Sequence, residues 1–231
     1  MEKIQNEINK LLEKYNQNIN KNDRKLQITK LGKIQNATVI PHLLDIYKKE
    51  TDDASMRNTV ILAILKTNIY TDESLNALLV GIDDNSEVVR RAVVMGLGRH
   101  KSPKGLPILL DKAENDPSEL VRGSATWALG QLGMEEALPL LIERCSDTRS
   151  HWAIRKTAVE GLGNFPSTPE HVNLLIKLLN DPKEDIRKAS IRALGQLNAK
   201  EALPDLKKLI ENEKSTHVRI EAKKIVKQFE G

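Results

Sequence analysis

Apolar side chains recur along the chain with a helical period inside a larger repeat of 32 or 33 residues. Seven arginines mark the register: Arg24, Arg57, Arg90, Arg122, Arg155, Arg187 and Arg219. The seventh position after each holds an aliphatic residue: Leu31, Ile64, Leu97, Leu129, Leu162, Leu194 and Val226. Apolar or small residues at −1, +2 or +3, +6 and +7 from the arginine share one face of a 3.6-residue period. Each arginine therefore stands at the start of a predicted amphipathic helix.

A further predicted helix precedes each arginine, as the apolar strings at 41–47, 106–110, 138–142 and 203–209 indicate. These strings carry Pro41, Pro107, Pro139 and Pro204 in the first turn, where the missing N–H costs nothing. Acidic turns connect the two helices. No stretch alternates apolar and polar residues as a half-buried strand does. The predicted unit is helix, turn, helix and short loop.

Glycine recurs eight positions after the arginine, as Gly32, Gly98, Gly130, Gly163 and Gly195. A residue without Cβ turns left-handed at little cost, so we expect these glycines to end the second helix of each unit. Small residues in the second helices would also let neighbouring helices approach closely.

The strings at 87–98, 119–133 and 185–197 resemble HEAT-like repeats, in particular the short repeats of phycobilisome-lyase-type proteins. The resemblance covers roughly 38–230, and the first unit keeps only Arg24, Leu31 and Gly32 of the pattern. It implies an all-α fold, a right-handed α-solenoid of about seven two-helix repeats. We expect one domain over 1–231, with a degenerate N-terminal capping repeat at 1–34, central repeats at 38–198 and a C-terminal capping repeat at 199–231.

An acidic residue lies six positions before four of the register arginines. The pairs are Asp84 and Arg90, Asp116 and Arg122, Asp181 and Arg187, and Glu213 and Arg219. The resemblance implies that they form an Asp–Arg ladder between repeats, in which a guanidinium reaches the carboxylate of its own or the adjacent turn. Ligand contact is the alternative. At Arg155 the acid is Asp147, eight residues away, so the fifth turn is longer and departs from the spacing.

Positions +1 and +5 of the second helices should face the concave inner surface of such a solenoid. Leu62, Met95 and Trp127 would form an apolar stripe there, beside a basic set of Arg91, Lys156, Lys188, Arg192 and Lys224. Exposed Met and Trp rimmed by charge are typical of a protein-binding hot spot. Alternatively, Trp127 fills a gap between helices. Trp152, in the longer fifth turn, either contacts a partner or covers the turn.

Composition excludes several classes of function. The single Cys145 cannot form an internal disulfide framework and suits a reducing compartment. The five histidines show no metal-ligand spacing, and no glycine-rich phosphate loop is present, so we predict no catalytic residues, no metal and no cofactor. The longest apolar run, Val60 to Leu65, is too short for a membrane span, and the first residues do not read as a secretory signal. These features favour a cytoplasmic protein without membrane contact.

The sequence therefore favours a non-catalytic scaffold or adaptor that binds a protein or peptide on the concave face, as a monomer or weak oligomer. Two alternatives stay open. The resemblance also implies an enzyme or enzyme subunit of HEAT-like type, either bilin-lyase-like or alkylated-DNA-glycosylase-like. The excess of 36 basic over 32 acidic side chains allows non-specific nucleic-acid binding.

Overall fold

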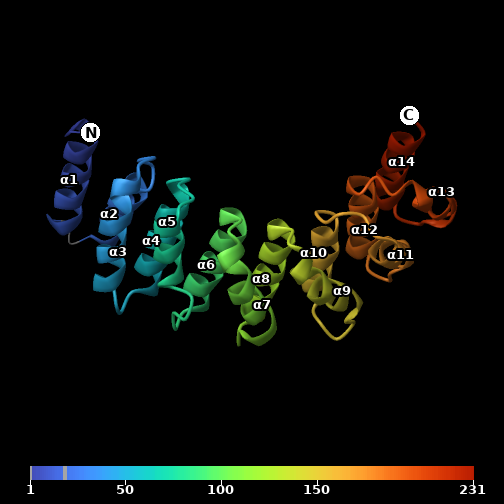
Figure 1. Cartoon of the computed structure of the whole chain (residues 1–231), viewed down its shortest axis with the longest axis horizontal. Helices are drawn as coiled ribbons and strands as arrows, with labels where there is room; N and C mark the ends of the chain where they lie inside the picture. The colour runs from blue at the N-terminus through green and yellow to red at the C-terminus, as the bar shows by residue number, and fades with distance from the viewer. Residues whose placement is uncertain (1, 18–19) are drawn as a thin grey trace. The chain divides into compact units, whose positions relative to one another are not determined.

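The computed structural model describes residues 2–17 and 20–231, and within these ranges the chain forms helices without a strand (Figure 1). The first helices of the seven pairs are α1 (Glu2–Gln17), α3 (Ile40–Lys49), α5 (Asp72–Leu79), α7 (Leu106–Asn115), α9 (Leu138–Ser146), α11 (Pro169–Leu178) and α13 (Leu203–Asn212). The second helices are α2 (Lys21–Leu31), α4 (Ala54–Lys66), α6 (Glu87–His100), α8 (Glu119–Leu132), α10 (Trp152–Leu162), α12 (Glu184–Gln196) and α14 (Thr216–Glu230). The all-α architecture of seven two-helix repeats is confirmed.

The chain divides into two compact units, one ending at His100 and the other running from Lys101 to Gly231. In the first unit, α2 packs on α4 and α4 packs on α6. In the second unit, α8 packs on α10, α10 on α12 and α12 on α14. Within each unit, neighbouring repeats are therefore joined mainly through their second helices.

Four of the first helices begin in the same way. Each follows a 3-10 turn and has proline at the start: the turns are Ala37–Val39, Pro103–Gly105, Glu135–Ala137 and Lys200–Ala202. Pro41, Pro107, Pro139 and Pro204 occupy the first turns of α3, α7, α9 and α13. Proline is favoured there because its fixed φ suits the helix and no hydrogen bond is lost.

The predicted apolar face of the second helices forms the core. The residues before six of the register arginines are all buried: Met56, Val89, Val121, Ile154, Ile186 and Val218. At +7 the side chains from Leu31 to Leu194 are buried as well, and Val226 in the last repeat is half-buried. Val226 lies on α14, the last of the described helices.

The expected helix-ending role of the glycines at +8 holds for Gly32 and Gly163 only, and the expected left-handed turn is wrong for both. Gly98, Gly130 and Gly195 lie inside their helices, and Gly32 and Gly163 cap theirs with right-handed φ values of −64° and −65°. Gly32, Gly130, Gly163 and Gly195 instead share close contact with the next second helix. A Cβ on Gly130 would lie 2.7 Å from the Cα of Gly161, which is closer than side chains tolerate. These four glycines therefore let adjacent second helices approach closely.

The left-handed turn comes three residues later, at +11. Asn68, Lys101, Gly133 and Asn198 occupy this position and have φ between 51° and 67°. Glycine and asparagine adopt this conformation at the lowest cost. The fifth repeat has Pro166 at +11. Proline is locked at negative φ, so this repeat must leave its second helix by a different loop.

Candidate functional site

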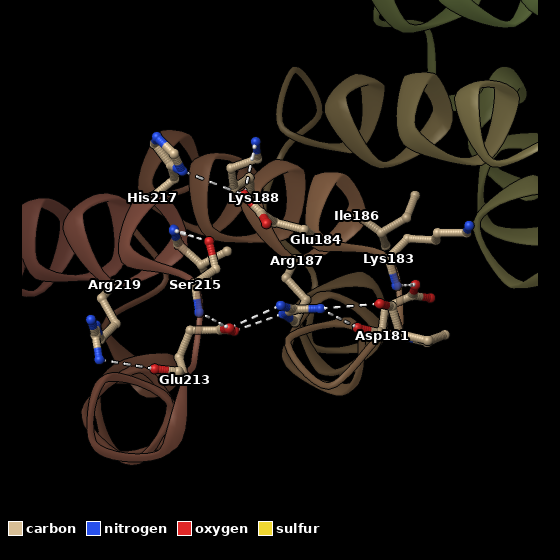
Figure 2. A network of polar contacts seen from close by, with 12 residues as sticks. Asp181, Lys183, Glu184, Ile186, Arg187, Lys188, Glu213, Ser215, His217 and Arg219 are labelled. Carbon is tan, nitrogen blue, oxygen red and sulfur yellow. Dashed lines mark hydrogen bonds and ion pairs between the residues drawn. The ribbon is translucent and has the colours of Figure 1, made fainter.

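Acidic and arginine side chains alternate along the turns that join the two helices of each repeat. Figure 2 shows one such stretch, where Arg187 lies between Asp181 and Glu213. The Arg187 Nε and Nη2 donate to the two carboxylate oxygens of Glu213 at 2.7 and 2.9 Å. Its Nη1 donates to the backbone carbonyl of Asp181 at 2.8 Å. One guanidinium thus joins the turn of its own repeat to the turn of the next.

Equivalent ion pairs recur with a constant separation along the chain. Arg57 donates to both carboxylate oxygens of Asp84, at 2.7 and 2.9 Å. Arg155 donates to the carboxylate of Asp181, and both side chains are more than nine-tenths buried. Arg24 pairs with Glu50 in the same way at the start of the chain. Each pair spans 26 or 27 residues, one repeat forward, and planar guanidinium–carboxylate contacts of this kind are geometrically specific.

The acceptor differs from the one that a spacing of six residues suggests. Arg90, Arg122, Arg187 and Arg219 each donate to the backbone carbonyl of the acid six residues before: Asp84, Asp116, Asp181 and Glu213. The carboxylates of Asp84, Asp181 and Glu213 accept from the arginine of the preceding repeat instead. Each of these three acids therefore binds two successive arginines with different groups.

The ion pairs lower the pKa of two ladder acids, Asp84 and Glu213. Burial would raise the pKa of the Asp84 carboxyl, but hydrogen bonds from Arg57, from the Tyr47 hydroxyl at 2.6 Å and from the Ser86 N–H lower it to about 2. Burial would also raise the pKa of Glu213, but the hydrogen bonds from Arg187 and from the Ser215 N–H lower it overall. Burial and the same carboxylate raise the pKa of Tyr47.

The ladder changes at the fifth repeat. Asp147 occupies the place of the acid, but its carboxylate accepts from the N–H and Nε of Arg149, at 3.0 and 3.1 Å, and from the Ser150 hydroxyl at 2.8 Å. Arg155 donates to the carbonyl of Cys145, ten residues before it. Within residues 2–17 and 20–231, Arg122 has its two backbone acceptors, Asp116 and Pro117, and no carboxylate partner.

A small hollow of about 210 Å³ opens on the second helices of the second unit. Its lining includes Trp127 and Gln131 of α8, Thr157 and Glu160 of α10, and Arg192 of α12. Trp127 is half-buried. The structure therefore brings together two of the predicted binding residues, Trp127 and Arg192, in one hollow.

Most of the predicted basic residues of the second unit are engaged by acids. Lys156 lies 3.3 Å from Glu160, and Arg192 donates to Glu221 at 2.8 Å. Lys188 lies 3.4 Å from Glu184 and 3.1 Å from Asp185. Lys224 is exposed. Because neighbouring carboxylates neutralise three of these four cations, the face carries little free positive charge.

In the first unit, the predicted binding residues lie on adjacent helices. Leu62 on α4 is 50% exposed, and Met95 on α6 is half-buried. Arg91 on α6 is exposed. The predicted stripe from Leu62 through Met95 to Trp127 extends over both units, so its continuity stays a prediction.

Sequence reasoning missed several apolar residues on the same helix faces. Val88 and Leu120, two positions before their register arginines, are 53% and 58% exposed, and Ile220 at +1 is 60% exposed. On a helix, positions −2, +1 or +2, and +5 lie one above the other. The signal was therefore present in the period itself: Leu120 and Trp127 are seven residues apart on α8.

Cys145 and Trp152 lie outside the hollow. Cys145 is fully buried, and burial raises the pKa of its thiol, so it is a packed side chain. Trp152 is 37% exposed at the start of α10, next to His151, whose side chain accepts a hydrogen bond from the Ala153 N–H and so caps the helix.

No cluster of metal-ligating side chains occurs in the described part of the chain. None of its helices there has the length and apolar character of a membrane span.

Comparison with known proteins agrees with this geometry. A family model described as HEAT repeats matches residues 75–151 and 148–225. The CpcE–CpcF complex of phycocyanin lyase from Nostoc sp. PCC7120 is 18% identical, with 92% of this chain and 91% of that chain covered and a TM-score of 0.58. The Escherichia coli protein YibA is 20% identical over 97% of this chain and 82% of its own, with a TM-score of 0.66.

An archaeal HEAT-like repeats protein from Thermococcus onnurineus NA1 is 15% identical, with 88% of this chain and 92% of that chain covered and a TM-score of 0.55. Among curated proteins, no sequence matches this chain. At these identities the structural neighbours establish an α-solenoid fold and nothing finer.

Proposed function

We propose that this chain, which belongs to the HEAT-repeat family, is a non-catalytic scaffold that binds a protein or peptide on the face formed by its second helices. The hollow around Trp127 is the observation that carries the proposal. Second helices of three successive repeats contribute to it, so the binding surface is a product of the stacking rather than of any single repeat.

The chemistry of this face suits a peptide. A half-buried indole beside amide and hydroxyl groups, such as Gln131 and Thr157, offers an apolar anchor site with hydrogen-bonding edges. Exposed Leu120 on the same helix extends the apolar surface by two turns. Aromatic residues with such surroundings contribute disproportionately to protein association.

The same face is poorly suited to nucleic acid. Phosphate binding needs cations that are available to the backbone, since affinity grows with the number of phosphates neutralised. Lys156, Lys188 and Arg192 are already paired with carboxylates. A peptide ligand with an apolar anchor makes better use of this surface than a polyanion does.

The proposal also takes support from one relative. The phycocyanin lyase structure is described as a complex of CpcE and CpcF, so a similar fold takes part in protein association there. Handling of a chromophore or of an alkylated base would need an acid or base constellation, and Glu160 stands in the hollow with Lys156 as its partner. No observation here favours catalysis over binding.

Selection from a displayed random-peptide library, followed by fluorescence titration, tests the proposal. Trp152→Phe leaves Trp127 as the single indole, so its emission reports directly on the hollow. We expect selected peptides to change this emission saturably. We expect the same peptides, carrying a fluorescent label and followed by anisotropy, to lose affinity by about tenfold or more in Trp127→Ala. Trp152→Ala is the matched control, because it removes an indole outside the hollow.

Three results would contradict peptide binding at Trp127. Peptides that bind Trp127→Ala as tightly as the wild type, with both proteins equally folded by circular dichroism, place the interface elsewhere. Strong binding of labelled DNA that falls steeply with salt supports the nucleic-acid alternative. Base release from alkylated DNA, or a coloured adduct with a bilin, supports the enzymatic one.

A further inference from the structure

Three grooves open between the turns of successive repeats, at equivalent places in the fold. The first, of about 450 Å³, contains Arg57 and Asp84. The second, of about 540 Å³, contains Arg187 and Glu213. The third, of about 440 Å³, lies between repeats four and five and contains Arg122. In the first two, the arginine makes a two-pronged contact with a carboxylate of the next repeat.

The third groove lacks that carboxylate contact. The longer turn of the fifth repeat directs Asp147 toward its own loop, where Arg149 and Ser150 occupy both of its oxygens. In the described residues Arg122 keeps only backbone acceptors, so the Nε and Nη2 that bind a carboxylate in Arg187 are left to solvent or ligand.

A second guanidinium reaches the same groove. Arg144, near the end of α9, lines it, and its Nη2 has one long contact of 3.4 Å to the carbonyl of Ala113. The Nε of Arg144 is buried and has no hydrogen-bond partner. A buried donor without an acceptor is costly, so the guanidinium of Arg144 has hydrogen-bonding capacity that the described residues leave unused.

The charges around the groove favour an anion. Arg122, Arg144 and Arg149 face it, against Glu119 and Asp147. Asp147 is already bound by Arg149, and Glu119 is exposed at the start of α8. The two guanidiniums without a carboxylate partner are therefore the groups available to a ligand.

We infer that the groove between repeats four and five binds a carboxylate from an acidic segment of a partner, which takes the place that Asp84 and Glu213 fill in the other two grooves. The inference rests on the proposed function in one respect, namely that the partner is a protein or peptide. It concerns a different surface, since Trp127 and the hollow do not line this groove.

The preference for carboxylate follows from the fold itself. Every other two-pronged contact of a register arginine in these grooves is made to Asp or Glu, so the backbone already places this guanidinium for a planar two-oxygen acceptor. Phosphate could use the same donors, and the test separates the two anions.

The test is a titration of ¹⁵N-labelled full chain, observed through the arginine Nε–H resonances. The probes are a capped peptide of glutamates, the glutamine peptide of the same length, and inorganic phosphate at matched ionic strength. We expect the glutamate peptide to shift the Arg122 and Arg144 signals saturably and to bind about tenfold or more tightly than the glutamine peptide. The Arg187 signal should stay in place, because Glu213 already occupies that guanidinium.

Variants complete the design. Arg122→Gln should abolish saturable binding, and Arg122→Lys should weaken it, because lysine keeps the charge without the fork. Arg219→Gln, in the same register of the last repeat, and Trp127→Ala should bind the glutamate peptide like the wild type. If the library selection yields no peptide that needs Trp127, but the glutamate peptide still binds at Arg122, the proposed binding face is wrong and the carboxylate site in the groove is retained.

The inference is overturned by any of three results. The glutamine peptide shifts the signals as strongly as the glutamate peptide, phosphate does so while the glutamate peptide does not, or the Arg187 signal moves together with that of Arg122. Each would show that a carboxylate has no specific place in this groove.

Discussion

Arg187 donates two parallel hydrogen bonds, 2.7 and 2.9 Å long, to the carboxylate of Glu213, and the backbone carbonyl of Glu213 in turn accepts from Arg219. One acid thus connects the arginines of two successive repeats. The Glu213 side chain is 5% exposed, so loss of Arg187 leaves a buried carboxylate without an ion-pair partner.

Arg187→Gln should therefore destabilise the protein by about 2–4 kcal/mol, because it removes a two-pronged ion pair from a mostly buried site. Arg122→Gln should cost about 1 kcal/mol, since it removes hydrogen bonds to two backbone carbonyls and no ion pair. Urea unfolding of the two variants beside the wild type measures the difference. Equal losses would contradict the distinct roles of these two arginines.

Asp84 should give the stability a specific dependence on pH. Its pKa is about 2 in the folded protein and about 4 in an unfolded chain, so its ionised form stabilises the fold above about pH 4, and this contribution is lost as the pH falls through 2. The amount is on the order of 2 kcal/mol. The stability difference between wild type and Asp84→Asn should stay constant from pH 7 to about pH 5 and shrink below about pH 4. A difference independent of pH down to 2 would contradict the assignment.

Gly130→Ala should be strongly destabilising, by about 2–4 kcal/mol, because the new Cβ would lie 2.7 Å from the Cα of Gly161 and push α8 away from α10. The effect should be visible in thermal unfolding and in faster hydrogen exchange of both helices. Gly123→Ala is the matched control, since its Cβ would meet only the side chain of Ile154, at 3.2 Å.

Gly133 tests the left-handed position. Gly133→Ala should cost about 1 kcal/mol, because φ is 67° there and nearby atoms leave room for the methyl group. Gly133→Asn should be nearly neutral, as Asn68 and Asn198 hold the equivalent position in other repeats. Melting temperatures of the two variants separate conformational strain from crowding: equal losses would mean that φ is not the cause.

Cys145 should be unreactive in the folded protein. Its side chain is fully buried, and burial raises the pKa of its thiol, so neither access nor the thiolate needed for attack is available. A coloured thiol reagent should react at the rate of unfolding and at full speed in denaturant. Fast reaction under native conditions would show that α9 opens locally.

The helix period and the arginine register were sufficient to predict the repeat architecture, because the same core positions recur at −1 and +7. The register was less informative about glycine. A glycine at +8 satisfies a helix stop and a close helix contact equally well, and only the packing of Gly130 on Gly161 decides between them. The left-handed residues at +11 were visible in retrospect, since Asn68, Gly133 and Asn198 are of the types that favour positive φ.

The partners in the ladder and the position of the hollow could not be predicted from one repeat, because both arise from contacts between repeats. Asp84 lies six residues from Arg90 and 27 from Arg57. The predicted ladder left open whether an arginine reaches the carboxylate of its own or of the adjacent turn, and the contact of Arg57 with Asp84 is of the second kind. The hollow around Trp127 arises where three helices meet, and no single repeat contains it. By contrast, the unusual length of the fifth turn was evident in the sequence, and it coincides with the break at Arg122.

The uniform span of the ladder also bears on how the chain folds. Each ion pair closes a loop of 26 or 27 residues, so none carries a larger closure entropy than another, and no pairing requires distant parts of the chain to meet first. Folding can thus begin at any well-paired repeat and advance to its neighbours. Arg122 makes no ion pair with repeat five, so folding gains less stabilisation when it passes from repeat four to repeat five. We expect propagation of folding to be slowest at this junction.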